Sequence, residues 1–284
     1  MEKKQSEVHD VKDFFNGYYY KHQKGEHTLC LIVGKSNEEK FIQVITEKFS
    51  WRLPFTKGNY FSERGIVLDI NTPELSLTGK IRYQGLSPIR YDVMGPFRFF
   101  PMECRHGIVS MSHQLDGSVT LNGEIIDFTG GRGYIEKDSG RSFPSSYTWV
   151  QSNSFQKNCS VVAAVAVIPV CNLKFRGCIC IIHYEGREYR LATYLGVRVL
   201  CCTEKKIVLQ QGRYRLDIRI HEKDGRHLSA PQNGRMTRTI VESAACPAEF
   251  VFYRGKKTVF HLHSDHASFE YEYDPDEKRR RTDF

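Results

Sequence analysis

The chain has 284 residues, and its 41 lysine and arginine residues outnumber 33 aspartate and glutamate residues, which gives a formal net charge of +8. This length is enough for one or two domains with a sizeable core. The basic residues are interleaved with acidic ones, so we expect no nucleic-acid partner. The longest apolar run, residues 161–171, is interrupted by Pro169 and is too short to cross a bilayer, so we expect no transmembrane segment.

The cysteines and the two ends of the chain indicate a cellular compartment. The nine cysteines include no Cys-x-x-Cys pair, and the first residues lack the apolar region of a secretion signal. An odd number of cysteines without such a signal favours a reducing environment, so we expect a cytoplasmic protein. The basic run at residues 278–281 predicts a solvated tail, with a weak contact to an anionic membrane surface as the alternative. The oligomeric state is left open.

Short segments rich in β-branched and aromatic residues, separated by turn residues, predict strands along nearly the whole chain. The one helix that we expect is short and lies near residues 8–15. Asp116 with Gly117 predicts a tight hairpin, and so does Glu185 with Gly186. The predicted strands span residues 27–33, 40–45, 66–70, 75–83, 107–114, 119–123, 147–151, 160–168, 178–184, 187–191, 197–202, 206–211, 213–221, 236–242, 248–253, 258–263 and 268–273.

So many short strands exceed what one small barrel holds, so we expect an all-β protein with two packed antiparallel barrel or sandwich domains. The expected N-terminal domain spans residues 1–153, and the expected C-terminal domain, with the basic tail, spans residues 154–284. Small antiparallel barrels can enclose one apolar ligand. The 18 phenylalanines and 15 tyrosines would suit such a lining.

Residues 130–153 concentrate glycines, carboxylates, arginines and aromatic rings in one segment. If this segment is extended, Tyr134, Glu136 and Asp138 share one face, with Ile135 and Lys137 opposite. Two shielded carboxyl groups this close cannot both ionise easily, so we expect one pKa to rise. A neutral carboxylic acid beside aromatic rings can protonate an apolar substrate. The alternative is an exposed strand face whose acids are solvated.

Residues 103–113, 126–138 and 141–144 resemble the tocopherol cyclase family, with weaker similarity at residues 17–23 and 235–243. The resemblance implies a two-domain lipocalin-like (calycin-like) β architecture, related in shape to carotenoid hydratases and lipid-handling proteins. It also implies binding of a prenylated quinol or another isoprenoid lipid. The implied reaction closes a chromanol ring under acid catalysis, without a cofactor.

We therefore expect Glu136 or Asp138 to protonate an alkene of the prenyl chain. His106 or Glu103 would then accept the proton of the quinol. Arg141 is predicted to act with this catalytic group, holding one carboxylate charged together with Arg132. The predicted ligand-binding residues, whose rings would shield a carbocation, are Arg132, Tyr134, Phe143, Tyr147 and Trp149.

Two alternative functions stay open. The family motif has a tryptophan where this chain has Ser139, which favours a non-catalytic carrier or sensor of an apolar ligand. Hydration of an isoprenoid double bond would use the same protonation, with water as the nucleophile.

A histidine cluster near the end of the chain is a weak metal candidate, although we expect these residues on the surface and no metal: His261, His263 and His266.

Overall fold

The computed structural model describes residues 14–170, 173–222 and 224–273. Within these residues the chain consists of antiparallel strands and two short 3-10 helices, η1 (Gly95–Phe99) and η2 (Thr193–Leu195), which confirms the predicted all-β class. No helix in the described part of the chain has the length and apolar character needed to cross a membrane. Of the expected helix, residues 8–13 lie outside the described residues and Phe15 begins a strand; the basic run at 278–281 also lies outside.

The first half of the chain forms one ten-stranded sheet with the order β4-β3-β2-β1-β10-β8-β7-β6-β5, and β9 pairs with β8. Neighbouring strands are antiparallel throughout this order. The strands are β1 (Phe15–Lys24), β2 (His27–Lys35), β3 (Lys40–Thr46), β4 (Ser50–Pro54), β5 (Tyr60–Ser62), β6 (Gly65–Asn71), β7 (Ser76–Gln84), β8 (Cys104–Leu121), β9 (Glu124–Asp127) and β10 (Arg132–Gly140).

The second half repeats this arrangement with the order β14-β13-β12-β11-β20-β19-β17-β16-β15, and β18 pairs with β19. The central pair β1–β10 of the first sheet therefore corresponds to β11–β20 of the second. The strands are β11 (Tyr147–Ser152), β12 (Cys159–Val170), β13 (Leu173–Tyr184), β14 (Arg187–Ala192), β15 (Arg198–Thr203), β16 (Lys206–Gln211), β17 (Tyr214–Ile220), β18 (Arg226–Gln232), β19 (Arg235–Arg254) and β20 (Lys257–Glu272).

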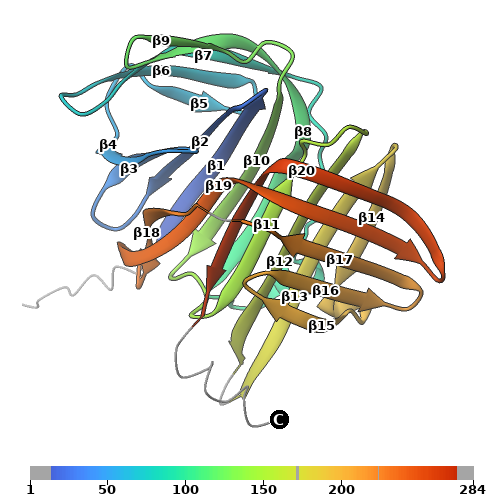
Figure 1. The fold of residues 1–284 in the computed structure, drawn as a ribbon. Helices are drawn as coiled ribbons and strands as arrows, with labels where there is room; N and C mark the ends of the chain where they lie inside the picture. The colour runs from blue at the N-terminus through green and yellow to red at the C-terminus, as the bar shows by residue number, and fades with distance from the viewer. Residues whose placement is uncertain (1–13, 171–172, 223, 274–284) are drawn as a thin grey trace, which may run out of the picture.

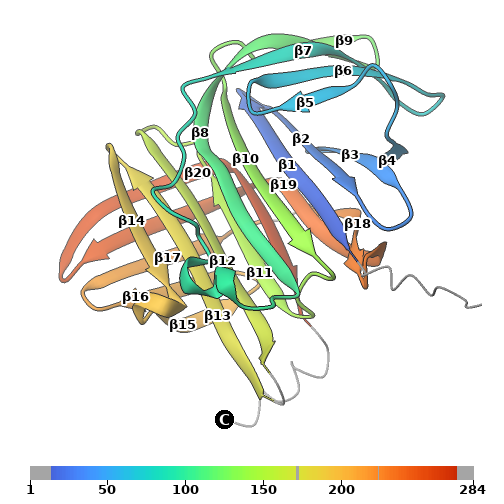
Figure 2. The ribbon, with the colours of Figure 1, turned by 180° about the vertical axis from the view of Figure 1, so that it is seen from behind.

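Each sheet is curled, as Figures 1 and 2 show from opposite sides. Each also has an apolar core of its own. Side chains alternate between the two faces of a strand, so every central strand serves two cores. On β1, Tyr20 packs inside the first sheet, whereas Tyr19 packs against the second sheet. On β11, Val150 packs inside the second sheet, whereas Trp149 faces the first. The result is the expected lipocalin-like pair of half-barrels.

A third apolar core, the interface core, lies between the two sheets and includes Tyr19, Met111, Tyr134 and Trp149. Hydrogen bonds also join the sheets. The Ser160 hydroxyl donates to the Met111 carbonyl at 2.6 Å. The amide of Gln43 donates to the carbonyl of Ser229 at 3.0 Å and accepts from its N–H at 2.8 Å. The strand pair β18–β19 thus docks against β3 and β4 (Figure 1).

The change from one sheet to the other falls between Gly140 and Tyr147. The strand expected at residues 147–151 was placed in the first domain, but as β11 it is a central strand of the second sheet. The exact division into domains at residue 153 stays a prediction.

The two predicted hairpins have different outcomes. Glu185 and Gly186 form one, with φ values of 46° and 73°, between β13 and β14. The prediction of a hairpin at Asp116 is wrong, because β8 continues through this point and Gly117 pairs with Ile81 of β7. Gly117 has a φ of 133°, and a Cβ there would lie 2.1 Å from the carbonyl oxygen of Lys80. The glycine therefore serves a close strand approach, not a turn.

Candidate active site

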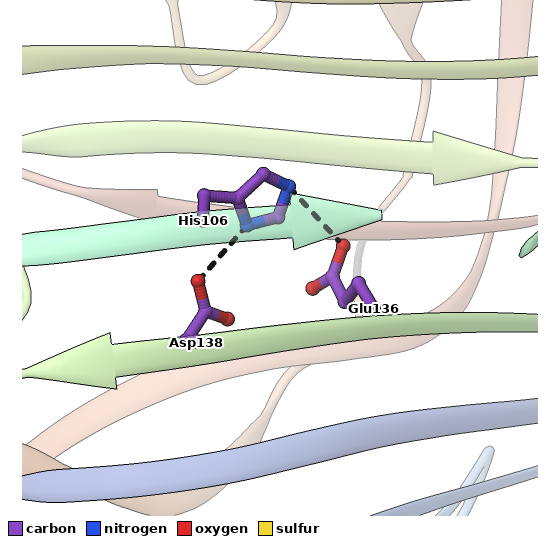
Figure 3. A group of neighbouring side chains, drawn as sticks. All are labelled: His106, Glu136 and Asp138. Carbon is purple, nitrogen blue, oxygen red and sulfur yellow. Dashed lines mark hydrogen bonds and ion pairs between the residues drawn. The ribbon is translucent and has the colours of Figure 1, made fainter. Parts of the chain in front are cut away.

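Three side chains of the first sheet meet at the interface with the second: His106, Glu136 and Asp138 (Figure 3). The His106 ring lies between the two carboxyl groups. Its Nδ1 is 2.9 Å from Asp138 Oδ1, and its Nε2 is 3.6 Å from Glu136 Oε2. The imidazole therefore bridges two acids that the sequence analysis placed on one strand face.

The register of β8 and β10 creates this arrangement. His106 on β8 is directly opposite Asp138 on β10, so their side chains share a face. Glu136 lies two residues before Asp138 and points the same way, while Ile135 packs inside the first sheet. The predicted common face of Tyr134 and Glu136 is also present, because the Tyr134 hydroxyl donates to Glu136 Oε2 at 2.5 Å.

Glu136 is held in a buried, aromatic environment. Its Oε2 accepts a second hydrogen bond from the indole Nε1 of Trp149, at 3.2 Å, which comes from the opposite sheet. Burial raises the pKa of Glu136 to about 7, and Asp138 adds to the rise, while His106 and Tyr134 oppose it. Near neutral pH both the protonated and the ionised carboxyl are thus populated. Glu136 is the acid whose pKa the sequence analysis expected to rise.

His106 has the opposite tendency. Burial disfavours its charge, but Asp138 and Glu136 outweigh this effect and raise the pKa of His106 to about 9. At neutral pH the ring is therefore an imidazolium that donates to Asp138. Together, His106 and Asp138 form a neutralised ion pair beside the protonated form of Glu136.

The same three residues are also the group, within the described chain, whose ligand atoms are close enough to hold a metal ion, all within 4.8 Å of one another. The two ring nitrogens of His106 face different carboxyl groups, however. An ion bound to Nε2 could also be bound by Glu136. Asp138 could not join it, because it lies on the other side of the ring, at Nδ1. This supplies one protein ligand fewer than catalytic zinc sites use. The geometry fits a bridging imidazolium better than a metal centre.

A cavity of about 650 Å³ opens beside Glu136, between the two sheets. This volume is within the range of pockets that bind small organic ligands. Most of its wall is apolar, from β1, β12, β13 and the segment around η1. The predicted site residues that line it are Glu103, His106, Glu136, Asp138, Phe143, Tyr147 and Trp149. The cavity therefore lies between the half-barrels, not inside one of them as expected.

Other predicted residues lie elsewhere. Arg132 and Arg141 are exposed and are not among the described residues that line the cavity. The positive charge beside the carboxyl groups comes from His106 instead. Tyr134 is fully buried behind Glu136 and orients it without lining the cavity. Ser139 faces away from Asp138 along β10 and is likewise not among the described lining residues, so the missing tryptophan removes no ring from this wall.

The candidate metal histidines are dispersed along β20. His261 pairs with Glu249 at 2.9 Å, and His263 pairs with Asp265 at 2.8 Å, both near the surface. His266 is half-buried and lies 3.4 Å from the Thr28 hydroxyl. These three were not brought together as one group of ligands among the described residues.

Three important residues were missed by the sequence analysis. Tyr19 and Glu270 line the cavity, and Glu242 lies behind them, fully buried. Tyr19 and Glu242 fall in residues 17–23 and 235–243, the two segments of weaker family similarity, so a signal for them was present. Glu270 had no such signal beyond its place on an expected strand.

The comparisons with known proteins identify the family. The sequence model of the tocopherol cyclase-like family matches residues 86–271, which include His106, Glu136 and Asp138. The chain belongs to the tocopherol cyclase-like family. No curated protein sequence matches the chain.

Two solved structures share the fold of this family member. One is kievitone hydratase from Nectria haematococca, with a TM-score of 0.54 and 14% identity over 92% of this chain and 89% of that one. The other is CghA with Sch210972, with a TM-score of 0.59 and 9% identity over 93% of this chain and 89% of that one. Both similarities span both half-barrels.

Proposed function

We propose that the protein binds a prenylated quinol or a related isoprenoid in the cavity between the two sheets and closes an oxygen-containing ring by acid catalysis. The observation that carries this proposal is the position of Glu136. It is a buried carboxyl group with a pKa near 7, hydrogen-bonded by Tyr134 and Trp149, on the wall of an apolar cavity. Membership of the tocopherol cyclase-like family supports the same reaction.

In the proposed reaction, protonated Glu136 gives its proton to one carbon of a trisubstituted alkene. The two electrons of the double bond form the new C–H bond and leave a tertiary carbocation. The rings of Tyr19, Tyr147 and Trp149 line the cavity, and each aromatic face near the cation contributes about 0.5–2 kcal/mol. A general acid in this position typically accelerates a reaction by about 10²–10⁴-fold.

The second half of the reaction forms the ring. A lone pair of the quinol oxygen forms the C–O bond, and the quinol proton passes to a base. Asp138 is suited to this role because it lies 2.9 Å from His106 Nδ1. Once Asp138 holds the proton, the His106 imidazolium balances the Glu136 carboxylate, whose Oε2 is 3.6 Å from Nε2. Transfer of the proton from Asp138 to Glu136 by way of the His106 ring then restores the acid for the next turnover. Glu103 also lines the cavity but is exposed, so it is the weaker candidate. The substrate and product are isomers, so the protons balance and no cofactor is consumed.

A second candidate function, hydration, uses the same acid. If water replaces the quinol oxygen as the nucleophile, the product is a tertiary alcohol. The name of one structural neighbour, kievitone hydratase, is in keeping with this chemistry. A non-catalytic carrier of an apolar ligand is the third interpretation, and Ser139 no longer favours it because this residue does not line the cavity.

Incubation with ortho-geranyl hydroquinone followed by liquid chromatography and mass spectrometry separates these functions. Cyclisation gives a chromanol of unchanged mass, hydration adds one water, and a carrier returns the substrate. We expect the chromanol, with its formation abolished in Glu136→Gln and in Asp138→Asn. The matched control is Glu124→Gln, an acid exposed on β9. Full turnover in Glu136→Gln would exclude Glu136 as the acid.

A further inference from the structure

The two sheets place equivalent aromatic–glutamate pairs at the interface. Because the strand order repeats, β1–β10 corresponds to β11–β20. In the first pair Tyr19 is directly opposite Glu136, and in the second Trp149 is directly opposite Glu270. All four residues line the cavity. Glu270 is therefore the counterpart of the proposed acid on the opposite wall.

The environment of Glu270 resembles that of Glu136. Its Oε2 accepts a hydrogen bond from the Tyr147 hydroxyl, as Glu136 accepts one from Tyr134. Its nearest strand neighbour on β19 is another buried acid, Glu242. Burial raises the pKa of Glu270 well above its ordinary range, and the charge of Glu242 raises it further. A neutral carboxyl group of this kind donates one hydrogen bond through its O–H.

The charged groups around the cavity have one sign apart from His106. Four carboxyl residues line it, Glu103, Glu136, Asp138 and Glu270, and no lysine or arginine is among its described lining residues. Two cations at the interface between the sheets, Lys21 and Arg238, are engaged elsewhere. The Lys21 Nζ donates to the carbonyl of His266 at 2.7 Å and to the Ser268 hydroxyl at 2.8 Å. Arg238 donates to the carbonyls of Pro144 and Ser145.

An anionic ligand would enter this space without a cationic partner. His106 is already paired with Asp138, so it cannot neutralise a second charge at no cost. Burying an unpaired charge is strongly unfavourable, whereas an uncharged oxygen that accepts a hydrogen bond is tolerated. The lining thus selects against carboxylate and phosphate groups.

We propose that Glu270 is a second ligand-binding acid, which donates a hydrogen bond to an oxygen of an uncharged isoprenoid ligand, and that the cavity rejects ligands with a carboxylate or a phosphate. This inference rests on the proposed function for the identity of the ligand class. It adds a specificity-determining residue on the second sheet, opposite the acid that protonates the substrate.

Equilibrium binding at neutral pH tests the inference with three probes of similar shape. These are ortho-geranyl hydroquinone, geranylbenzene without oxygen, and geranylbenzoate with a carboxylate. The chain has two tryptophans, so a Trp51→Phe background leaves Trp149 in the cavity wall as the single fluorescent reporter. We expect the hydroquinone to bind at least about ten-fold more tightly than the benzoate.

Substitutions at Glu270 then assign the donor. Glu270→Met is expected to weaken hydroquinone binding by roughly five- to ten-fold, the effect of one lost hydrogen bond, without weakening geranylbenzene binding. Glu270→Gln keeps an N–H donor and is expected to restore hydroquinone binding to within about three-fold of the parent. Glu124→Met on β9 is the matched control and should leave all three affinities unchanged.

Equal affinity for hydroquinone and benzoate would overturn the inference, and this comparison needs no substitution at Glu270. Equal weakening of hydroquinone and geranylbenzene in Glu270→Met would also overturn it. The outcome is separate from that of the proposed function. A carrier would show the same binding selectivity without forming chromanol, whereas an enzyme with a different role for Glu270 would form chromanol without this selectivity.

Discussion

Tyr19 on β1 donates a hydrogen bond of 2.6 Å to Oε1 of Glu242 on β19, across the interface between the two sheets and across 223 positions of sequence. Glu242 is fully buried, and its Oε2 has no hydrogen-bond partner among the described residues. The tyrosine ring also makes an edge contact with Trp149, with 5.5 Å between ring centroids. One side chain therefore supports a buried acid and the aromatic wall of the cavity together.

Removal of this hydroxyl in Tyr19→Phe should destabilise the protein by about 1–3 kcal/mol, because it leaves a buried carboxyl with no donor on either oxygen. Urea unfolding monitored by circular dichroism measures this change. Tyr18→Phe is the matched control, since Tyr18 is on the opposite face of β1 and packs against the first sheet's core. Equal effects of the two substitutions would contradict the importance of the Tyr19 bond.

The pH dependence of stability should reveal the buried acids. Burial raises the pKa of Glu242 from its ordinary value of 4.5 to about 7. Between these values the folded state binds more protons than the unfolded state, so stability falls as pH rises from about 4.5 through 7. Above pH 7 the ionisation of this one group lowers the free energy of unfolding by about 3 kcal/mol. The raised pKa of His106 acts in the same direction, and its stabilisation is lost as pH rises through about 9.

Glu242→Gln isolates one of these contributions, because the amide oxygen still accepts from Tyr19 but cannot ionise. We expect this variant to be more stable than the parent at pH 8 and close to it at pH 5. Urea unfolding at the two pH values provides the comparison. A stability difference that is the same at both values would show that Glu242 does not titrate with folding.

The activity should depend on pH through Glu136, which must be protonated to act as the acid. We expect turnover to fall as pH rises through about 7. His106→Asn removes the neighbouring positive charge that favours the ionised form of Glu136. The descending limb of the pH–rate profile should therefore move to higher pH, together with a loss of maximal rate of about 10²-fold. An unmoved limb would mean that another group limits the rate.

Gly117 and Gly123 allow a matched test of close strand packing. Both have positive φ, but a Cβ at Gly123 would meet nothing within 4 Å, whereas one at Gly117 would approach the Lys80 oxygen at 2.1 Å. Gly123→Ala should cost about 1–2 kcal/mol from backbone strain alone. Gly117→Ala should cost more than about 3 kcal/mol, since β7 and β8 must also separate. Thermal unfolding of both variants measures the two losses of stability. Similar losses would contradict the close approach of the strands at Gly117.

Local patterns predicted the strands well because alternation and turn residues act over short distances. The predicted strand at residues 206–211 has the bounds of β16, and the hairpin at Glu185 is present. The predictions failed where turn-forming residues occur inside long strands. Two strands were expected at residues 236–242 and 248–253, but β19 runs through both, with shifts in its pairing with β20. Bulges and turns use similar residues, and only the partner strand distinguishes them.

The candidate site was predictable as far as one strand determines it. Periodicity alone placed Tyr134, Glu136 and Asp138 on one face. The bridge from His106 depends on the register between β8 and β10, which no local pattern specifies. The cavity itself depends on how two sheets dock, so the position of Glu270 on the opposite wall could not be anticipated. Arg132 is exposed and not among the described lining residues, because nearness in sequence does not carry a side chain to the buried face.

Because one wall of the cavity belongs to each half of the chain, occupancy and docking of the halves are thermodynamically linked. A ligand bound in the cavity would raise the melting temperature of the intact chain in proportion to the logarithm of the ligand concentration. A fragment that ends at residue 146 would keep Glu136 but lose Trp149 and Glu270, and its acid would face open water. The proposed ligand binding thus requires the joined pair of half-barrels, because neither half forms the cavity alone.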